Sequence, residues 1–210
     1  MKPIVSVMKA AMMATLLCMI TSCSGEGKLF EGAGDIGSPK LKGSFTYDEA
    51  TQVYTLTGAG TNMWLQSDEF FMVWKKESGD FSLSARIAFE GEGVNAHRKL
   101  GLIIRETLAG ESRYADVAVH GDGLTSLQYR DATGGETREV VAPTPGADHI
   151  TLERAGRKIL IKTGTGAYAQ TPTGEIEIDL PDTCYIGLFV CSHEEDVLET
   201  ARFSDVRYRP

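Results

Sequence analysis

The sequence has little cysteine, no cluster of basic residues and no long hydrophobic run. Only four of its 210 residues are cysteine. A chain of this length buries about 70% of the surface that its unfolded form exposes, so it needs neither disulfides nor a structural metal to fold. Lys and Arg number 21 against 29 Asp and Glu, which gives a net charge of −8. An acidic chain without a basic patch is not expected to bind DNA or RNA.

The motifs of several enzyme and cofactor classes are also missing. The sequence contains no Gly-x-Ser-x-Gly elbow, no His-Glu-x-x-His pattern, no phosphate-binding loop and no clustered cysteine ligands. We therefore predict no cofactor and no metal site. One alternative stays open, because the carboxylates of Asp35 and Asp205, near the two ends of the exported chain, are of the type that holds a structural Ca²⁺.

The N-terminal segment has the pattern of a secretory signal peptide. Lys2 and Lys9 precede an apolar stretch, Ala10 to Thr21, whose 12 residues are too few to cross a bilayer. The stretch ends at Ile20-Thr21-Ser22-Cys23, which resembles the lipobox of bacterial lipoproteins. This resemblance implies that residues 1–22 are removed, that Cys23 is lipidated, and that the protein is exported and anchored to the bacterial cell envelope, at its periplasmic face or at the cell surface. An ordinary signal peptide with an incidental cysteine is the alternative.

Two cysteines, Cys184 and Cys191, remain in the body of the exported protein besides Cys23. They lie seven positions apart in one predicted strand, so they point to opposite faces and are separated by about 23 Å. This distance is too long for a disulfide. We predict two buried free thiols.

The chain divides into three parts. Residues 1–22 are the signal peptide, and residues 23–40, rich in Gly, Ser and charge, are predicted to form a tether. In residues 41–210, apolar and polar residues alternate in short runs, and no segment shows a helical period. We predict strands at residues 43–47, 53–57, 70–74, 81–89, 99–105, 115–120, 124–130, 149–154, 158–163, 175–180, 184–192 and 201–208.

About a dozen short strands with tight turns predict an all-β body. Hairpins are expected at Gly121-Asp122-Gly123 and at Ala155-Gly156. The expected fold is a two-sheet antiparallel β-sandwich of jelly-roll type. A propeller would show a repeat of about 40 to 50 residues, and the sequence has none.

Several motifs along residues 35–206 carry a family resemblance. Their order resembles that in the concanavalin A-like lectin/glucanase superfamily, in modules that secreted bacterial proteins carry beside glycoside hydrolases or ahead of TolB-like propellers. The resemblance implies a curved β-sandwich whose concave face binds glycans. The motifs are Asp35-Ile36-Gly37-Ser38-Pro39, Gly58-Ala59-Gly60, Met63-Trp64, Gly79-Asp80-Phe81, Gly101-Leu102-Ile103-Ile104-Arg105-Glu106, Gln128-Tyr129-Arg130, Leu152-Glu153-Arg154-Ala155-Gly156 and Phe203-Ser204-Asp205-Val206.

Strand alternation predicts one polar surface across three neighbouring strands. Opposite the apolar residues of these strands lie Arg105, Asp116, His120, Gln128 and Arg130. Planar groups with several donors and acceptors are suited to binding sugars, and an aromatic ring supplies a stacking face. Trp64 and Trp74 are the candidates for that ring. The alternatives are a solvated sheet face with structural ion pairs, and tryptophans that belong to the core.

We therefore predict a lipid-anchored carbohydrate-binding module without catalysis, and two alternatives remain. Glu194-Glu195-Asp196-Val197-Leu198-Glu199 matches the Glu-x-Asp-x-x-Glu pattern of concanavalin-like glycoside hydrolases, in which Glu194 and Glu199 would be the catalytic pair. Against this, Glu195 occupies a position that is apolar in those enzymes, and the acidic run reads as a solvated loop. The other alternative is a structural or assembly domain that binds an envelope protein.

Overall fold

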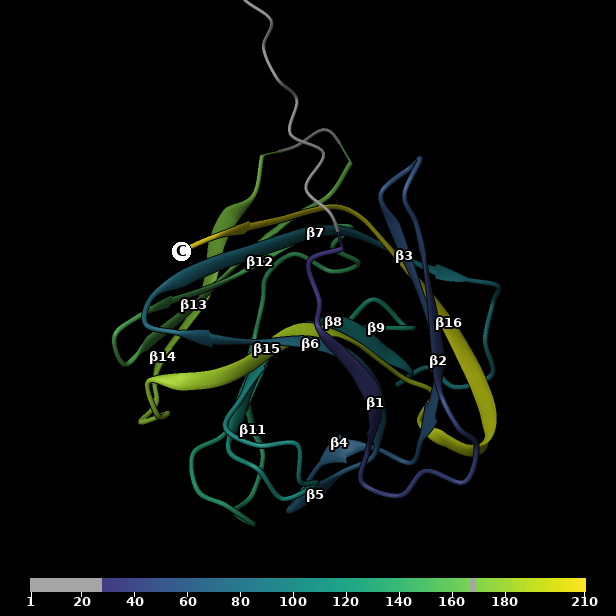
Figure 1. Ribbon diagram of the computed structural model, residues 1–210, viewed down its shortest axis with the longest axis horizontal. Helices are drawn as coiled ribbons and strands as arrows, with labels where there is room; N and C mark the ends of the chain where they lie inside the picture. Colours follow the sequence, from purple (N-terminus) through teal and green to yellow (C-terminus); the bar gives the residue numbers. More distant parts are fainter. Residues whose placement is uncertain (1–27, 167–168) are drawn as a thin grey trace, which may run out of the picture.

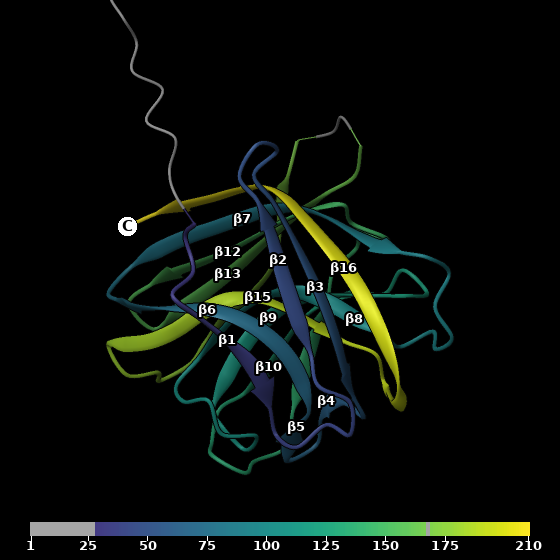
Figure 2. The same ribbon diagram turned by 45° about the vertical axis from the view of Figure 1, so that its right-hand side comes forward.

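The computed structural model describes residues 28–166 and 169–210, and within them the chain folds into two seven-stranded antiparallel sheets and a two-stranded ribbon. Figures 1 and 2 show the sheets packed face to face. The first sheet has the order β1 (Gly32–Ile36), β6 (Phe70–Ser78), β15 (Thr183–Cys191), β8 (Lys99–Arg105), β9 (Tyr114–His120), β10 (Thr125–Arg130) and β11 (Arg138–Val141). The second has the order β14 (Thr171–Glu177), β13 (Lys158–Gly164), β12 (His149–Ala155), β7 (Phe81–Glu90), β16 (Glu194–Arg209), β3 (Val53–Gly60) and β2 (Ser44–Asp48). The ribbon pairs β4 (Met63–Trp64) with β5 (Ser67–Asp68).

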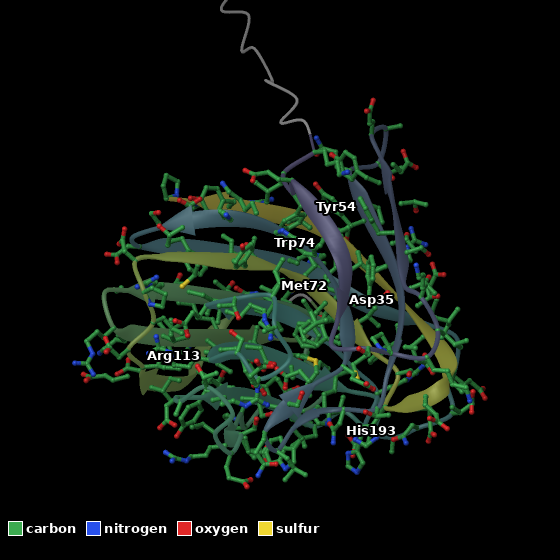
Figure 3. All side chains as sticks on the ribbon, turned by 60° about the horizontal axis from the view of Figure 1, so that its bottom comes forward. Asp35, Tyr54, Met72, Trp74, Arg113 and His193 are labelled. Carbon is green, nitrogen blue, oxygen red and sulfur yellow. The ribbon has the colours of Figure 1, made fainter. Side chains whose placement is uncertain are left out.

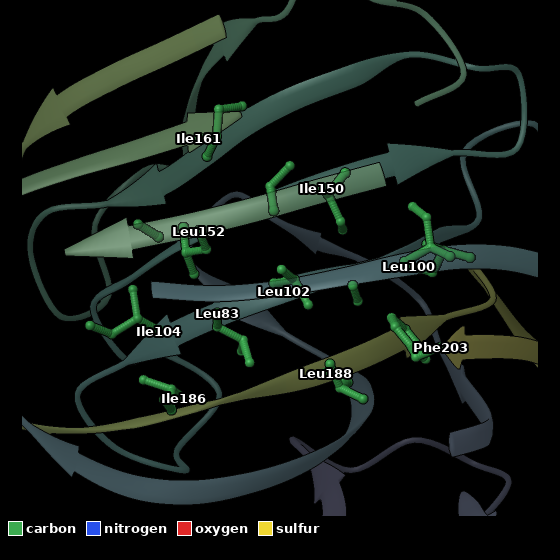
Figure 4. Close-up of a cluster of buried hydrophobic side chains, with 14 of the residues drawn as sticks. Leu83, Leu100, Leu102, Ile104, Ile150, Leu152, Ile161, Ile186, Leu188 and Phe203 are labelled. Atoms are coloured by element: carbon green, nitrogen blue, oxygen red, sulfur yellow. The ribbon is translucent and has the colours of Figure 1, made fainter. Parts of the chain in front are cut away.

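The main core lies between the two sheets and follows from the alternation in each strand. In β7, Phe81, Leu83, Ala85 and Ile87 are buried, whereas the residues between them are partly or fully exposed. Leucine, isoleucine and phenylalanine side chains from both sheets meet in this layer (Figure 4). The predicted all-β, jelly-roll sandwich is confirmed. Among the described residues, no helix is long and apolar enough to cross a membrane.

Both predicted hairpins are present. β9 pairs with β10 across residues 121–124, and β12 pairs with β13 across Gly156. Gly123 and Gly156 have φ angles of 91° and 61°. Glycine adopts these values without the steric penalty that a side chain would add.

The first sheet buries a second apolar layer on the face that points away from the second sheet, which we call the outer face. Met72 of β6, Ile103 of β8 and Phe189 of β15 lie in this layer, together with Met63 of the ribbon. The β4–β5 ribbon covers part of the outer face, so the first sheet is buried on both sides there. This explains why every residue of β8 and β9 is buried.

Four parts of the strand prediction are corrected by the structure. The predicted tether, residues 23–40, contains β1, which pairs with β6. The strand predicted at 175–180 lies at Thr171–Glu177 and has a bulge in its pairing with β13. The acidic run at 194–199, predicted to be a loop, begins β16. The short strands β4, β5 and β11 were not predicted. Residues 1–22 and Cys23 lie outside the described residues.

The two cysteines of the body behave as predicted. Both lie in β15, both are buried and both are free. Cys184 belongs to the layer between the sheets, and Cys191 belongs to the outer layer. Opposite faces of one strand keep the thiols apart.

Candidate functional site

A pocket of about 230 Å³ opens on the outer face of the first sheet, beside the ribbon. Figure 3 shows the side of the molecule on which it lies, with Met72 and Trp74 of β6 and with His193, which lines the pocket. Strands β8, β9 and β10 form the floor, and β4, β11 and four loops form the rim. The lining residues are Asn62, Trp64, His97, Lys99, His120, Leu124, Gln128, Glu139 and His193.

The five polar residues that alternation places together do share the outer face. Gln128 of β10 lies directly opposite Asp116 of β9, and the register carries Arg105, His120 and Arg130 to the same side. The structure then separates them. His120 and Gln128 line the pocket, Asp116 is completely buried, and Arg105 and Arg130 are also fully buried, away from solvent.

His120 and Gln128 are held to one another at the pocket floor. The Gln128 Nε2 atom lies 3.2 Å from His120 Nε2. Burial is the main effect on the imidazole, with the nearby Lys99 ammonium second, and together they lower the pKa of His120 to about 3. The imidazole is therefore neutral at pH 7, and one ring nitrogen donates while the other accepts.

Unpartnered polar atoms gather on β9 and β10 at and beneath this pair. Asp116 Oδ2, His120 Nδ1, Ser126 Oγ and Gln128 Oε1 are the four buried side-chain atoms of the described chain that have no hydrogen-bonding partner within it. Each such atom costs about 1–3 kcal/mol. Native proteins keep few of them. His120 and Gln128 line the pocket, whereas Asp116 and Ser126 do not, so two of the four atoms favour a polar ligand there.

Asp116 supports this picture because it does not behave as an ordinary exposed carboxylate. Burial raises its pKa well above the usual range, although the Lys99 ammonium acts in the opposite direction. Its Oδ1 atom accepts a hydrogen bond of 3.3 Å from the Gln128 backbone N–H. The second oxygen is the unpartnered one.

Lys99 forms one side of the pocket, and hydrogen bonds to the start of the ribbon and the residue before it fix its ammonium group. Its Nζ donates to Asn62 Oδ1 at 2.9 Å and to the Met63 carbonyl at 3.4 Å. An ammonium group has three N–H donors, so one donor remains for a ligand. Burial lowers the pKa of Lys99.

Of the two candidate stacking tryptophans, only Trp64 reaches the pocket. It is half-buried at the end of β4, and Lys99 Nζ lies 5.8 Å from its ring centroid. Trp74 of β6 is instead covered by β1, since a Cβ added at Gly32 would lie 2.5 Å from the indole. The Trp74 indole therefore packs against the glycines of β1 and does not reach the pocket.

Two further histidines complete the rim. The rings of His97 and His193 have centroids 5.6 Å apart, and His97 lies 5.9 Å from His120 in an edge-on arrangement. Burial lowers the pKa of His193. Among the described residues, no group of three or more His, Cys, Asp or Glu side chains is arranged to hold a metal ion.

Arg105 and Arg130 have a different environment from the one predicted, because both face Asp68 of β5. Arg130 contacts both oxygens of the Asp68 carboxylate, at 2.7 and 2.9 Å, and Arg105 lies 3.5 Å away. All three side chains are fully buried. Backbone carbonyls of the surrounding loops accept the other guanidinium hydrogens, among them those of Leu65, Thr107 and Gly135. This cluster fastens the ribbon to the outer face.

The carboxylates of the alternative catalytic pair lie in dissimilar places. Glu199 is buried, and its Oε2 pairs with Arg98 Nη1 at 2.7 Å. Glu194 is exposed and accepts a hydrogen bond from Asn95 Nδ2 at 2.8 Å. A retaining glycosidase needs two carboxyls facing one cleft. The Glu199 carboxylate is thus held in an ion pair with Arg98, and the Glu194 carboxylate is not.

The two carboxylates considered for calcium are each engaged separately. Asp35 Oδ1 accepts a hydrogen bond from the Gly43 backbone N–H at 3.0 Å. Asp205 Oδ2 lies 3.3 Å from Arg86 Nε.

Comparison with known proteins supports the fold and leaves the family open. No family model and no curated protein matches the sequence. Solved structures do match. A functionally unknown protein from Saccharomyces cerevisiae aligns with a TM-score of 0.60 at 16% identity, over 84% of this chain and 95% of its own. Carbohydrate-binding module CBM66 from Bacillus subtilis aligns with a TM-score of 0.53 at 14% identity, over 87% and 98%.

A basic winged bean lectin solved with Tn-antigen aligns with a TM-score of 0.53 at 10% identity, over 84% of this chain and 96% of its own. GH43 proteins from Bacillus licheniformis and Bacteroides ovatus also match, but the chain covers only 38% and 32% of their length. Identities this low establish a shared β-sandwich fold and nothing finer.

Sequence reasoning missed several pocket residues. Lys99 occupies a polar-face position of β8, and alternation alone places it beside His120. Asn62, Glu139, His97 and His193 come from loops or from β11, and no local pattern shows that they meet. Asp68 was missed for the same reason, since only the folded ribbon brings it to the two arginines.

Proposed function

We propose that the protein is an exported, lipid-anchored carbohydrate-binding module that has no catalytic activity of its own. The observation that carries this proposal is the outer-face pocket, in which an aromatic ring, Trp64, lies beside the polar groups of Lys99, His120 and Gln128. An aromatic wall with a few fixed donors and acceptors is a common form of small-molecule site, and the ring can stack on a sugar while the polar groups meet its hydroxyls.

The structural neighbours are consistent with this proposal. They include a carbohydrate-binding module and a lectin, each aligned over almost its whole length. In this account His120, Gln128 and Trp64 contact the glycan. Asp116 accepts a hydrogen bond from the Gln128 backbone N–H beneath the pocket, and Arg105 and Arg130 hold the ribbon that carries Trp64.

The experiment that tests the proposal is native affinity electrophoresis of the chain from Gly25 to Pro210. The gels are cast with a panel of neutral and acidic polysaccharides, and each is then stained for intact polymer. We expect retardation without clearing in at least one gel. Clearing of the polymer would instead favour a glycoside hydrolase that uses Glu194 and Glu199. In that case Glu194→Gln would abolish the clearing.

A third outcome has its own meaning. A folded protein that no polysaccharide retards and that binds no free sugar would favour the structural or assembly domain, and an envelope protein that co-purifies with the anchored chain would identify its partner. Bare gels without polymer provide the reference mobility in every case.

A further inference from the structure

The His120–Gln128 pair has a property that restricts its ligand. If Gln128 donates from Nε2 to the imidazole, His120 carries its proton on Nδ1, and the unpartnered atoms are one donor and one acceptor. If the amide is turned over, His120 Nε2 donates to the amide oxygen, and Nδ1 becomes an acceptor while the amide NH₂ becomes a donor. A neutral imidazole thus leaves one donor and one acceptor in either orientation.

The other two unpartnered atoms, Ser126 Oγ and Asp116 Oδ2, lie on the same two strands, but their residues are fully buried and do not line the pocket. Hydroxyl groups both donate and accept, so adjacent hydroxyls of a sugar can satisfy the donor and the acceptor of the His120–Gln128 pair. A carboxylate placed against the pair only accepts, so it would leave the acceptor of the pair unsatisfied.

The charges around the pocket also favour an uncharged ligand. Lys99 supplies one positive charge, and Glu139 on the opposite rim supplies one negative charge. His120 and His193 add no charge at pH 7, because burial holds the pKa of each below its usual value. An acidic sugar would meet Glu139 as well as Lys99 and would gain little.

The volume limits the size of the guest. At about 230 Å³, the pocket is smaller than the range typical for drug-sized ligands, which is roughly 300–1,000 Å³. This volume is of the order of one sugar ring lying against Trp64.

We infer that the pocket, if it binds carbohydrate as proposed above, takes a single neutral sugar ring whose adjacent free hydroxyls meet His120 and Gln128. It does not take a uronate or the interior of a polymer chain. A free monosaccharide and the terminal residue of a polysaccharide carry the same hydroxyls, so both sources share this chemistry.

The test uses saturation-transfer NMR with a set of free sugars on the purified protein. The neutral probes are D-glucose, D-galactose, D-mannose, D-fructose, D-xylose and L-arabinose, and the acidic ones are D-glucuronate and D-galacturonate. We expect transfer to at least one neutral sugar and to neither uronate. The variant Gln128→Met keeps the size of the side chain and should weaken the binding of that sugar at least tenfold. The control is Gln170→Met, which should leave the binding unchanged, because Gln170 accepts a hydrogen bond from Thr151 on the second sheet.

Competition in the polysaccharide gels identifies the source. If the same neutral sugar abolishes retardation, the ligand is a chain end, and if it binds while no gel retards the protein, the ligand is the free sugar. Binding of a uronate in preference to neutral sugars, or competition only by oligosaccharides of three or more residues, would overturn the inference while leaving carbohydrate binding intact. Neither retardation nor transfer to any sugar would remove the proposed function itself.

Discussion

Asp68 is a single carboxylate that serves two buried guanidinium groups. The free-energy cost of burying Arg105 and Arg130 is offset only while this partner is present, because breaking a buried ion pair by removing one member leaves an uncompensated charge. We expect Asp68→Asn to lower the free energy of unfolding by about 3–5 kcal/mol, measured by urea denaturation. Asp131→Asn is the control, since Asp131 pairs with Arg138 on the surface and should cost less than about 1 kcal/mol. A loss for Asp68→Asn as small as that of the control would contradict the structural role of the cluster.

His120 makes stability depend on pH in a defined direction. Its pKa is about 3 in the folded protein and roughly 6.5 in the unfolded chain. Between these values the unfolded chain binds more protons, so stability decreases as the pH falls from about 6.5 toward 3. Acid titration of the unfolding free energy should show a contribution of up to about 1.4 kcal/mol per pH unit within that window. Carboxylates contribute in the same range, so the measurement is the difference between the wild type and His120→Gln, and parallel curves for the two proteins would refute the assignment.

At the level of single elements, β1 is a strand that the sequence did not predict. Residues 23–40 contain many glycines, which is typical of a tether, but two of these glycines allow β1 to lie against Trp74. A Cβ at Gly32 would lie 2.5 Å from the indole, and one at Gly34 would lie 3.3 Å from it. Close approach to an aromatic side chain, and not flexibility, is the reason for glycine here. That reason becomes visible only when β6 is in place.

The β1 packing leads to a test with a matched control. Gly32→Val should lower the free energy of unfolding by about 1–3 kcal/mol, because overpacking forces the strand or the indole to move. Ala33→Val, one residue later, faces the exposed side of the same strand and should change stability by less than about 0.5 kcal/mol. Guanidinium denaturation of both variants gives the comparison. Equal effects would mean that β1 does not pack against Trp74.

In the site, strand alternation predicts which residues share a face, but, as for β1, it does not predict contacts with distant segments of the chain. Alternation along β8, β9 and β10 placed five polar residues on one face, because side chains on neighbouring strands follow the pleat. It could not show that the β4–β5 ribbon crosses this face, since Met63 and Asp68 come from a segment with no strand-length pattern. The ribbon buries Arg105 and Arg130 and leaves the pocket at the other end. Burial therefore determines which predicted residues a ligand can reach.

At the scale of the whole molecule, the proposed anchor concerns Cys23. If this cysteine is lipidated, the protein produced in a bacterium that processes lipoproteins should be recovered in the membrane fraction. Cys23→Ser should move it to the soluble fraction, while the folded body is unchanged. Cys191→Ser is the control for cysteine loss, because that thiol is buried in the outer layer. Equal fractionation of the wild type and Cys23→Ser would contradict the anchor.

The proposed non-catalytic sugar site lies at the outer-face pocket. We would first measure the retardation of the wild type, Trp64→Ala and Leu65→Ala in the polysaccharide gel that slows the wild type most. Leu65 is the next residue in the ribbon, is 54% exposed and does not line the pocket. We predict that Trp64→Ala loses most of the retardation, that Leu65→Ala keeps it, and that the polymer stays intact. Equal retardation of all three proteins, or clearing of the polymer around them, would contradict the account.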